Sequence, residues 1–353
     1  LAPGDLFIAL SGAADPRYFG AGGSGRDGHD FVADAALKGA AAALVSRKLD
    51  AAIPLLQVDD TFTALWQLAA GARERFRNPV FAVTGSSGKT TVKSMLAAAL
   101  PGSHASEGSF NNHIGVPLSL ARLAREARTG IFEIGMNSPG EIAPLARLVR
   151  PDVALVLNVL GVHLEKLGSL AAIRREKLSI AAGLDPNGML VVPDTLALEG
   201  SDHRGRTLTF GSGPDADVRL LEDEGGRAQI ALPDGARLSL QLAVDGPHRR
   251  LSATAVVACL LAAGLDAAPA LSRLETMQPP KGRGGSFEAA GVRIVDDSYN
   301  ANPDSVRLAL QGLREQPAGR RFALLGDMLE LGADELDLHA GLAPSCSGLD
   351  GVF

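Results

Sequence analysis

The sequence is poor in cysteine, in aromatic residues and in basic charge. Two cysteines in 353 residues provide neither a disulfide framework nor a zinc knuckle, and they fit a reducing compartment. Aromatic residues make up only 4% of the chain, which argues against a base-stacking platform for nucleic acid. A general polyanion binder is normally basic, whereas this chain has a formal net charge of −6. We therefore expect no nucleic-acid partner, and any site for an anionic ligand must be local.

Long hydrophobic runs are also missing. The longest run, Ala253 to Leu265, is too short to cross a bilayer and predicts a buried core helix. The first residues, Leu1-Ala2-Pro3-Gly4-Asp5, lack the basic start of a secretory signal. We therefore expect a cytoplasmic protein with no membrane insertion. The sequence starts without methionine and stops at Gly351-Val352-Phe353, just after a helical pattern, so we expect it to be shortened at both ends.

The composition is that of a folded protein with more than one domain. Hydrophobic residues make up 46% and charged residues 21% of the chain, which excludes an intrinsically disordered protein. A length of 353 residues allows two or three domains, with a core that needs no disulfide or structural metal.

Two breaks in the pattern divide the chain into three segments. Residues 1–78 resemble a small α/β unit, and Asn78-Pro79 ends it. Residues 79–280 alternate apolar runs of strand length with helical patterns, which predicts a parallel sheet covered on both faces. The second break is Pro279-Pro280-Lys281-Gly282, after which residues 281–353 begin another α/β unit.

Hydrophobic periodicity predicts the individual elements. Strands are expected at Asp5–Leu10, Ala41–Val45, Val80–Thr84, Ile131–Gly135, Val153–Val159, Val292–Val295 and Phe322–Leu325, the last two as buried strands. Helices are expected at Asp30–Gly39, Thr61–Phe76, Thr90–Leu100, Ser252–Ala263 and Asp304–Leu313. Four short patterns predict an antiparallel patch at Leu208–Phe210, Val218–Leu221, Gln229–Leu232 and Leu238–Ala243.

The clearest motif is a glycine-rich loop between an apolar strand and a helix, Thr84-Gly85-Ser86-Ser87-Gly88-Lys89-Thr90-Thr91. Glycines let successive N–H groups approach a polyphosphate, and the helix N-terminus adds partial positive charge. Lys89 can reach the terminal phosphates of ATP, and the Thr90 hydroxyl can join a magnesium shell. A plain Gly/Ser turn capped by threonine is the alternative, but it does not account for Gly-Lys-Thr-Thr in this context. The candidate nucleotide-binding residues are Gly85, Ser86, Ser87, Gly88, Lys89, Thr90 and Thr91.

The loop departs from the common phosphate-binding loop and is similar to that of one family. The position five before Gly88 is Val83 rather than glycine, so the loop is a shortened variant. It resembles the loop of the Mur ligase superfamily, the ATP-dependent amide-forming enzymes of cell-wall synthesis, together with the related folylpolyglutamate synthases. The resemblance runs from about Gly4 to the last residue. Its other stretches are Ser109–Leu118, Glu133–Asn137, Asn158–Glu165, Asp296–Pro303 and Leu325–Gly332.

The last two stretches are the most specific, and they favour the members that use D-alanyl-D-alanine. The resemblance implies a three-domain α/β architecture: a small N-terminal domain that binds the UDP substrate (1–78), a central parallel-sheet ATPase domain (79–280) and a partial Rossmann-like ligase domain (281–353). It also implies an activity, the ATP-dependent joining of D-alanyl-D-alanine to a UDP-N-acetylmuramoyl-tripeptide through an acyl phosphate. We expect a monomer.

Two other functions stay open. One is a sister amide ligase that uses a different amine, such as a folate polyglutamylating enzyme or another Mur ligase. The other is a nucleotide-binding module without ligation. No Ser/His/Asp or Cys/His arrangement indicates a covalent enzyme intermediate, and Cys259 falls in the apolar run expected in the core.

Several polar residues are candidates for metal binding. Glu133 ends an apolar strand, where a parallel sheet places its ligands, so we favour a magnesium ligand over a surface carboxylate. His163 and Lys177, read alone, are a solvated histidine and part of a charged helix face. The resemblance implies a second magnesium ion held with His163, and a Lys177 amine carbamylated by CO₂. Most basic residues of this chain are arginines, and only seven are lysines. A lysine in such a chain suggests a role that arginine cannot fill.

The resemblance also assigns nucleotide and substrate contacts. Asp297 and Asn300, which otherwise suit a turn before a helix, are implied near the nucleotide. Arg283 is implied near its phosphates, with a solvated linker arginine as the alternative. Asp327 is implied at a closing face between domains, and we count it with Lys89, His163 and Lys177 as catalytic. Asn111 and Asn112 are candidate substrate-binding residues, with turn residues as the alternative. Arg249 and Ser252 stand where the family usually has asparagines.

Overall fold

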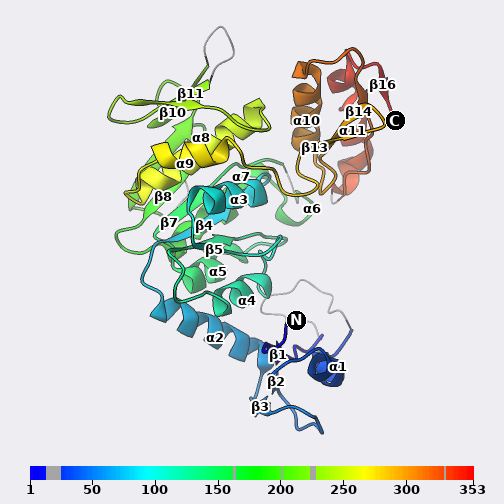
Figure 1. Ribbon diagram of the computed structural model, residues 1–353. Coiled ribbons are helices and arrows are strands. Elements are labelled where there is room, and N and C mark those ends of the chain that lie inside the picture. Colours follow the sequence, from blue (N-terminus) through cyan, green and yellow to red (C-terminus); the bar gives the residue numbers. More distant parts are fainter. Residues whose placement is uncertain (13–24, 162–163, 200–201, 223–227, 330) are drawn as a thin grey trace.

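The computed structural model describes residues 1–12, 25–161, 164–199, 202–222, 228–329 and 331–353. Its largest part is a nine-stranded sheet of order β12-β11-β10-β9-β8-β7-β4-β6-β5 (Figure 1). The strands are β4 (Val80–Thr84), β5 (Ser103–Ala105), β6 (Thr129–Glu133), β7 (Val153–Val156), β8 (Met189–Pro193), β9 (Arg206–Gly211), β10 (Val218–Glu222), β11 (Ala228–Ala231) and β12 (Arg237–Leu240).

β4 shows why helices cover both faces of this sheet. All five of its residues are buried, and it pairs in parallel with β6 on one side and β7 on the other. Its alternate side chains enter different cores because successive residues of a strand point to opposite faces. Phe81 and Val83 join the core under α3 (Lys89–Ala99), α8 (Pro247–Ala262) and α9 (Ala268–Leu274). Val80 and Ala82 join the core formed with α2 (Thr61–Arg75), α4 (Gly115–Ala121), α5 (Ile142–Val149) and α7 (Leu170–Leu178). The predicted sheet with two covered faces is confirmed.

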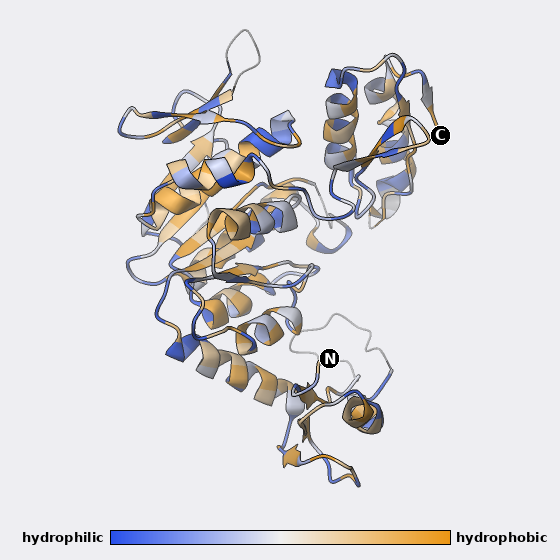
Figure 2. Ribbon diagram, in the orientation of Figure 1, coloured by the Kyte–Doolittle hydropathy of each residue, from blue (hydrophilic) through white to orange (hydrophobic). Residues whose placement is uncertain are grey.

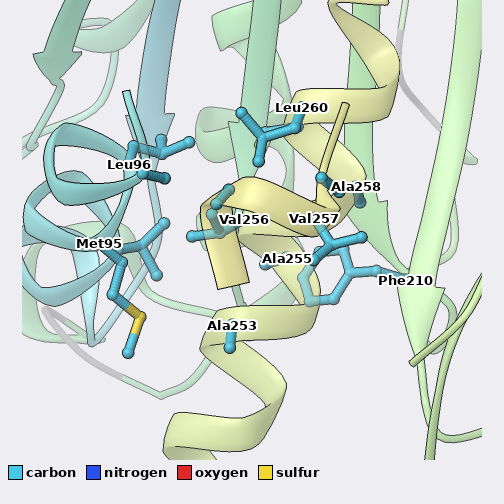
Figure 3. Close-up of a cluster of buried hydrophobic side chains, with 14 of the residues drawn as sticks. Met95, Leu96, Phe210, Ala253, Ala255, Val256, Val257, Ala258 and Leu260 are labelled. Carbon is cyan, nitrogen blue, oxygen red and sulfur yellow. The ribbon is translucent and has the colours of Figure 1, made fainter. Parts of the chain in front are cut away.

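The long apolar run is a core helix, as predicted. Residues Ala255 to Leu260 of α8 are at most 1% exposed, and they pack against Met95 and Leu96 of α3 and Phe210 of β9 (Figure 3). Figure 2 shows the hydrophobic colour concentrated in these helices and in the strands beneath them. Burial raises the pKa of the Cys259 thiol in this helix, consistent with a packing role. No helix in the described part of the chain is long and apolar enough to cross a membrane.

The predicted antiparallel patch is wrong in one strand, β9. β9 runs parallel to both β8 and β10, whereas β11 is antiparallel to its two neighbours, β10 and β12. The patch is not separate, because β9 adds to the free edge of β8 and extends the central sheet. An unpaired β8 edge would leave a row of backbone N–H and C=O groups without partners, and this pairing satisfies them.

A smaller parallel sheet forms the beginning of the chain. Its order is β1 (Leu6–Ile8), β2 (Ala42–Val45), β3 (Leu55–Gln57), with the 3-10 turn Gly28–Phe31 and α1 (Val32–Leu37) between the first two strands. α2 then leads into the central sheet and packs along α4. At its end, Arg73 donates hydrogen bonds to the carbonyl oxygens of Val149 (2.6 Å) and Arg150 (2.7 Å), which joins α2 to the last turn of α5.

The end of the chain forms two small sheets, seen apart from the central sheet in Figure 1. β13 (Gly285–Ala289) and β14 (Val292–Asp296) are an antiparallel hairpin, and β15 (Phe322–Ala323) pairs in parallel with β16 (Gly351–Val352). The remaining elements are α6 (Leu164–Leu167), α10 (Pro303–Glu315), α11 (Glu335–Ala340) and the 3-10 turns Ser179–Gly183, Gly332–Asp334 and Ala343–Cys346.

The predicted burial of the two strands in this last part is wrong. Val292 is 59% exposed and Val295 44%, while Phe322 is 42% exposed. The apolar pattern located the strands correctly, but each belongs to a two-stranded sheet, which presents most of its surface to solvent unless another layer packs on it. α10 begins with a capping box in which the side chains of Asn302 and Ser305 each bond the other residue's backbone N–H.

Candidate functional site

The glycine-rich loop lies at the carboxyl end of β4, in the middle of the parallel part of the sheet. This is the edge at which parallel α/β sheets bind ligands. Gly88 is the N-cap of α3 and has φ of +77°, a left-handed conformation that favours glycine. A Cβ atom there would also lie 2.9 Å from Leu157 Cδ2. The backbone can therefore turn sharply into α3 at residue 88 because that residue is glycine.

Asn158, two residues after the end of the neighbouring strand β7, holds the first half of the loop. Its Oδ1 accepts hydrogen bonds from the backbone N–H groups of Ser86 (2.9 Å) and Ser87 (3.0 Å). Its Nδ2 donates to the Ser87 carbonyl oxygen at 3.1 Å. The Ser86 hydroxyl donates to the Leu160 carbonyl oxygen at 3.2 Å. The loop is therefore fixed to the sheet by β7 as well as by its own strand.

The second half of the loop carries its charge and its hydroxyl groups. The Lys89 ammonium donates to the Gly85 carbonyl oxygen at 2.8 Å. Burial lowers the pKa of Lys89, and the nearby Glu133 carboxylate opposes this shift. The Thr90 hydroxyl donates to Glu133 Oε2 at 2.8 Å. Thr91 instead faces a small hollow that Met95 and Arg249 also line.

Glu133 is the carboxylate around which the site is built. It ends β6, is 1% exposed, and receives Thr90 on Oε2 and the Asn111 side-chain amide on Oε1 at 2.7 Å. The Lys93 ammonium lies 3.5 Å from Oε2. Sequence reasoning located Glu133 correctly at the ligand edge of the sheet. It missed Lys93, although Lys93 stands four residues after Lys89, on the same face of a helix, in a chain with few lysines.

The two candidate substrate asparagines have different surroundings. Asn111 lies against Gly135, where an added Cβ would be 2.8 Å from Asn111 Cγ, and its carbonyl oxygen accepts the Gly135 N–H at 2.8 Å. Asn112 is exposed, and its Oδ1 accepts the N–H groups of Ile114 (3.1 Å) and Gly115 (2.8 Å) at the start of α4. Asn112 therefore stabilises the turn before α4, the role given above as the alternative to substrate binding. Their substrate contacts stay predictions.

Ser109 joins the central sheet to the end of the chain. Its hydroxyl accepts hydrogen bonds from Tyr299 Oη (2.7 Å) and Arg283 Nη2 (3.3 Å), and it lies 3.4 Å from the Thr90 hydroxyl. The Arg283 guanidinium also stacks 3.9 Å over the Tyr299 ring. Arg283 is close enough to Lys89 and Lys93 to lower the pKa of both. Arg283 is therefore beside the loop, as expected, and Ser109 and Tyr299 are contacts that the sequence did not indicate.

Among the described residues, no hydrogen bond or ion pair joins the loop to the other residues expected from the end of the chain. Desolvation raises the pKa of Asp297, while Arg249 and Arg283 oppose the rise. Asn300 accepts the N–H of the next residue, Ala301, at 2.9 Å. Asp327 is exposed, and in the part of the chain that the structure describes no hydrogen bond or ion pair joins it to the loop. The nucleotide and catalytic roles of these three residues stay predictions.

Lys177 is buried near the loop on α7. Its sequence neighbour Glu176 anchors this helix to α5. Glu176 accepts the backbone N–H groups of Gly140 (2.8 Å) and Ile142 (2.9 Å) at the start of α5. Lys177 is 2% exposed, so the solvated helix face considered for it is wrong. Burial and, secondly, repulsion by Lys89 hold the pKa of Lys177 well below its usual range. His163, the proposed partner in a metal site, lies outside the described residues.

Comparisons with known proteins relate this chain to one family. The sequence profile of the Mur ligase middle domain matches residues 83–260, and that of the Mur ligase glutamate ligase domain matches residues 282–353. The chain is 36% identical to UDP-N-acetylmuramoyl-tripeptide--D-alanyl-D-alanine ligase of Escherichia coli, an alignment that covers all of this chain and 78% of that protein. The chain belongs to the Mur ligase family.

Two solved Mur ligases share the fold at comparable identity. The crystal structure of MurF from Acinetobacter baumannii is 35% identical with a TM-score of 0.85, covering 99% of this chain and 77% of that one. MurF from Thermotoga maritima, solved in complex with ADP, is 30% identical with a TM-score of 0.82, covering 100% of this chain and 81% of that one.

Arg249 and Ser252, at the positions where the resemblance led us to expect asparagines, lie in the first turns of α8. Arg249 is 6% exposed and donates from Nη2 to the Arg283 carbonyl oxygen at 2.7 Å. Burial lowers the pKa of this guanidinium, and Asp297 opposes the shift. The Ser252 hydroxyl bonds back to the His248 carbonyl oxygen at 2.8 Å. The arginine therefore connects α8 to the segment that leads into β13.

The residues around the loop fit a magnesium ion completed by other oxygen ligands. Mg²⁺ prefers hard oxygen donors, and in nucleotide sites one or two protein ligands are joined by phosphate oxygens and water. Glu133 Oε2 and Thr90 Oγ1 lie 2.8 Å apart and supply two such donors. No group of three His, Cys, Asp or Glu side chains with metal-ligand geometry occurs among the described residues. The arrangement therefore suits a metal that arrives with a nucleotide.

The buried Lys177 amine gives a prediction for stability. The unfolded chain takes up a proton near the usual lysine pKa of 10.5, whereas the folded chain does so only at a lower pH. Between these two values the unfolded state binds more protons, so the free energy of unfolding falls as pH falls. In CO₂-free buffer, Lys177→Met should raise that free energy near neutral pH by about 1 kcal/mol or more. The gain should shrink as the pH approaches the unfolded value.

Urea denaturation at neutral and alkaline pH measures the effect. The matched control is Lys38→Met, because Lys38 is exposed on the first segment and the free energy should then change little at either pH. An equal free energy for Lys177→Met and the unchanged protein near neutral pH would show that the buried amine is not desolvated as described.

Proposed function

We propose that this protein catalyses the ATP-dependent addition of D-alanyl-D-alanine to a UDP-N-acetylmuramoyl-tripeptide. The observation that carries the proposal is the convergence of Lys89, Thr90 and Glu133 at the carboxyl edge of the sheet, in a chain that matches named ligases of this specificity over its whole length. These relatives favour D-alanyl-D-alanine over the amines of sister ligases. The reaction belongs to peptidoglycan precursor synthesis, and we place it in the cytoplasm.

The loop and the cations around it supply the nucleotide site. Backbone N–H groups at the start of α3 and the helix dipole face the phosphates. Lys89 exchanges its bond to the Gly85 carbonyl oxygen for the terminal phosphates of ATP, and Arg283 is close enough to contribute a second cation. This clustering of positive charge explains how a chain with a net charge of −6 accommodates a polyanion.

The chemistry is two successive transfers between substrates. A carboxylate oxygen of the tripeptide forms a bond to the γ-phosphorus of ATP, the bond to the bridging oxygen breaks, and ADP leaves with an acyl phosphate formed. The amine of D-alanyl-D-alanine then attacks the acyl carbon, loses a proton, and expels phosphate. The cations orient two anionic reactants and stabilise the charge that develops between them. The enzyme itself forms no bond to either substrate.

The finer assignments extend this proposal. Thr90 and Glu133 hold one Mg²⁺ and His163 contributes to a second; bound Mg²⁺ reduces the repulsion between the carboxylate and the phosphates. The neutral Lys177 amine attacks CO₂ and loses a proton, which gives a carbamate with oxygen donors. Asn111 and Asn112 contact the peptide substrate, Asp297 and Asn300 the nucleotide, and Asp327 the closing face. Residues 1–78, 79–280 and 281–353 are the three domains, and we expect a monomer.

Phosphate release tests the function directly. With ATP, Mg²⁺ and the UDP-tripeptide, release should require D-alanyl-D-alanine, and Lys89→Met should reduce it by roughly 100-fold or more, since transition-state charge stabilisation is lost. Lys38→Met is the control and should leave the rate unchanged. Release that does not depend on the dipeptide would refute the ligase, and release with a different amine would point to a sister ligase. Nucleotide binding without any turnover would indicate the non-catalytic module.

A rescue experiment tests the carbamate. Lys177→Ala removes the amine, so activity in the same assay should be lost. Short carboxylic acids supply oxygen donors in the vacated space, and they should restore part of it. Lys89→Met should show no such rescue, because its defect is a missing cation. Full activity of Lys177→Ala without added acid would overturn the assignment.

A further inference from the structure

Lys93 is a buried cation that the proposed reaction does not use. It lies on α3 one turn after Lys89, and its side chain is 4% exposed. Its ammonium lies 3.5 Å from Glu133 Oε2 and donates a hydrogen bond to the Gly108 carbonyl oxygen. Burial lowers the pKa of Lys93, and Glu133 is the main group that opposes this shift. The lysine is thus held between one carboxylate and one backbone carbonyl, both far from it in sequence.

Packing does not account for a lysine at this position. Val92, Met95, Leu96 and Ala99 of the same helix supply its apolar contacts to the core. An ion pair taken out of water gains little stability over apolar side chains of the same size, because desolvation offsets the attraction. A charge at this place is better explained by the groups it touches.

Those groups belong to two different parts of the site. Glu133, with Thr90, forms the oxygen pair at the carboxyl end of the sheet. Gly108 belongs to the loop 106–112, which also carries Ser109, in contact with Tyr299 and Arg283, and Asn111, which donates to the other oxygen of Glu133. The Lys93 ammonium therefore fixes this loop at a set distance from the carboxylate and offsets the carboxylate's charge.

We propose that Lys93 is a positioning residue that holds the loop 106–112 in its substrate-binding position and, by sharing Glu133, weakens the binding of a divalent cation in the absence of nucleotide. The proposal deepens the proposed function, on which it rests. A dication that reaches Glu133 meets the field of the ammonium, so tight binding requires the additional charge of nucleotide phosphates. The same ammonium keeps the loop from moving away from the carboxylate.

The two roles predict changes of opposite sign when the charge is removed. Lys93→Met keeps the length and apolar character of the side chain. The Glu133 carboxylate loses a neighbouring positive charge, so nucleotide-free protein should bind Mn²⁺ at least about tenfold more tightly. The loop loses its bond at Gly108, so KM for the UDP-tripeptide should rise by roughly tenfold. A general loss of packing would weaken both.

The experiment combines a titration of nucleotide-free protein with Mn²⁺, followed by electron paramagnetic resonance, and steady-state kinetics with the UDP-tripeptide. Lys38→Met is the matched control and should reproduce the unchanged protein in both. Lys93→Arg keeps the charge and should keep the weak Mn²⁺ binding. Circular dichroism shows whether Lys93→Met folds. If it does not, the same two measurements on Lys93→Gln, which lacks the charge, and on Lys93→Arg, which keeps it, make the comparison.

Tighter Mn²⁺ binding together with a higher KM supports the proposal. Weaker binding of both ligands, or no change in either, overturns it. The Mn²⁺ titration does not require turnover, so it tests this proposal even if the protein is not a ligase. A failure of the proposed ligase function would be seen separately, as the absence of phosphate release by the unchanged protein.

Discussion

The site depends on one buried negative charge. Glu133 is 1% exposed at the end of β6, and a carboxylate in such a place is stable only when it is paired and hydrogen-bonded. Thr90 and Lys93 come from α3, and Asn111 from the loop after β5. Each of these segments is therefore fixed relative to β6 by the need to satisfy the same group. The phosphate loop is in turn fixed to β7 by Asn158.

Charge is distributed very unevenly in this protein. The chain as a whole is acidic, yet Arg283 lies close enough to Lys89 and to Lys93 to lower the pKa of both. Such clustering of like charges raises the energy of the empty site and is relieved when a polyphosphate binds. Relief of this repulsion therefore contributes part of the favourable free energy of ATP binding. The contacts of Ser109 with Arg283 and Tyr299 bring the end of the chain to the same place.

The sequence predicts well what is local in the chain. β4, the glycine-rich loop and α3 follow one another directly, so apolar periodicity and a motif suffice to place Gly88, Lys89 and Thr90. Lys93 and Tyr299 escaped detection because their roles arise from contacts with residues far away in the sequence, 190 positions in the case of Tyr299 and Ser109. Periodicity likewise located β14 and β15 but not their exposure, since an apolar pattern does not reveal whether another layer covers the strand.

The charge of Glu133 is tested most directly by hydrogen exchange. Glu133→Gln keeps the shape of the side chain but removes the charge that pairs with Lys93, and one of its two carboxylate acceptors becomes an N–H₂ donor that faces the present donors Asn111 and Thr90. Backbone amides of 85–91 and 106–112 should then exchange at least about tenfold faster, because local opening costs less, while those of β1 to β3 and α10 should be unchanged. Equal protection of both loops in the variant and the unchanged protein would contradict the view that this carboxylate organises the site.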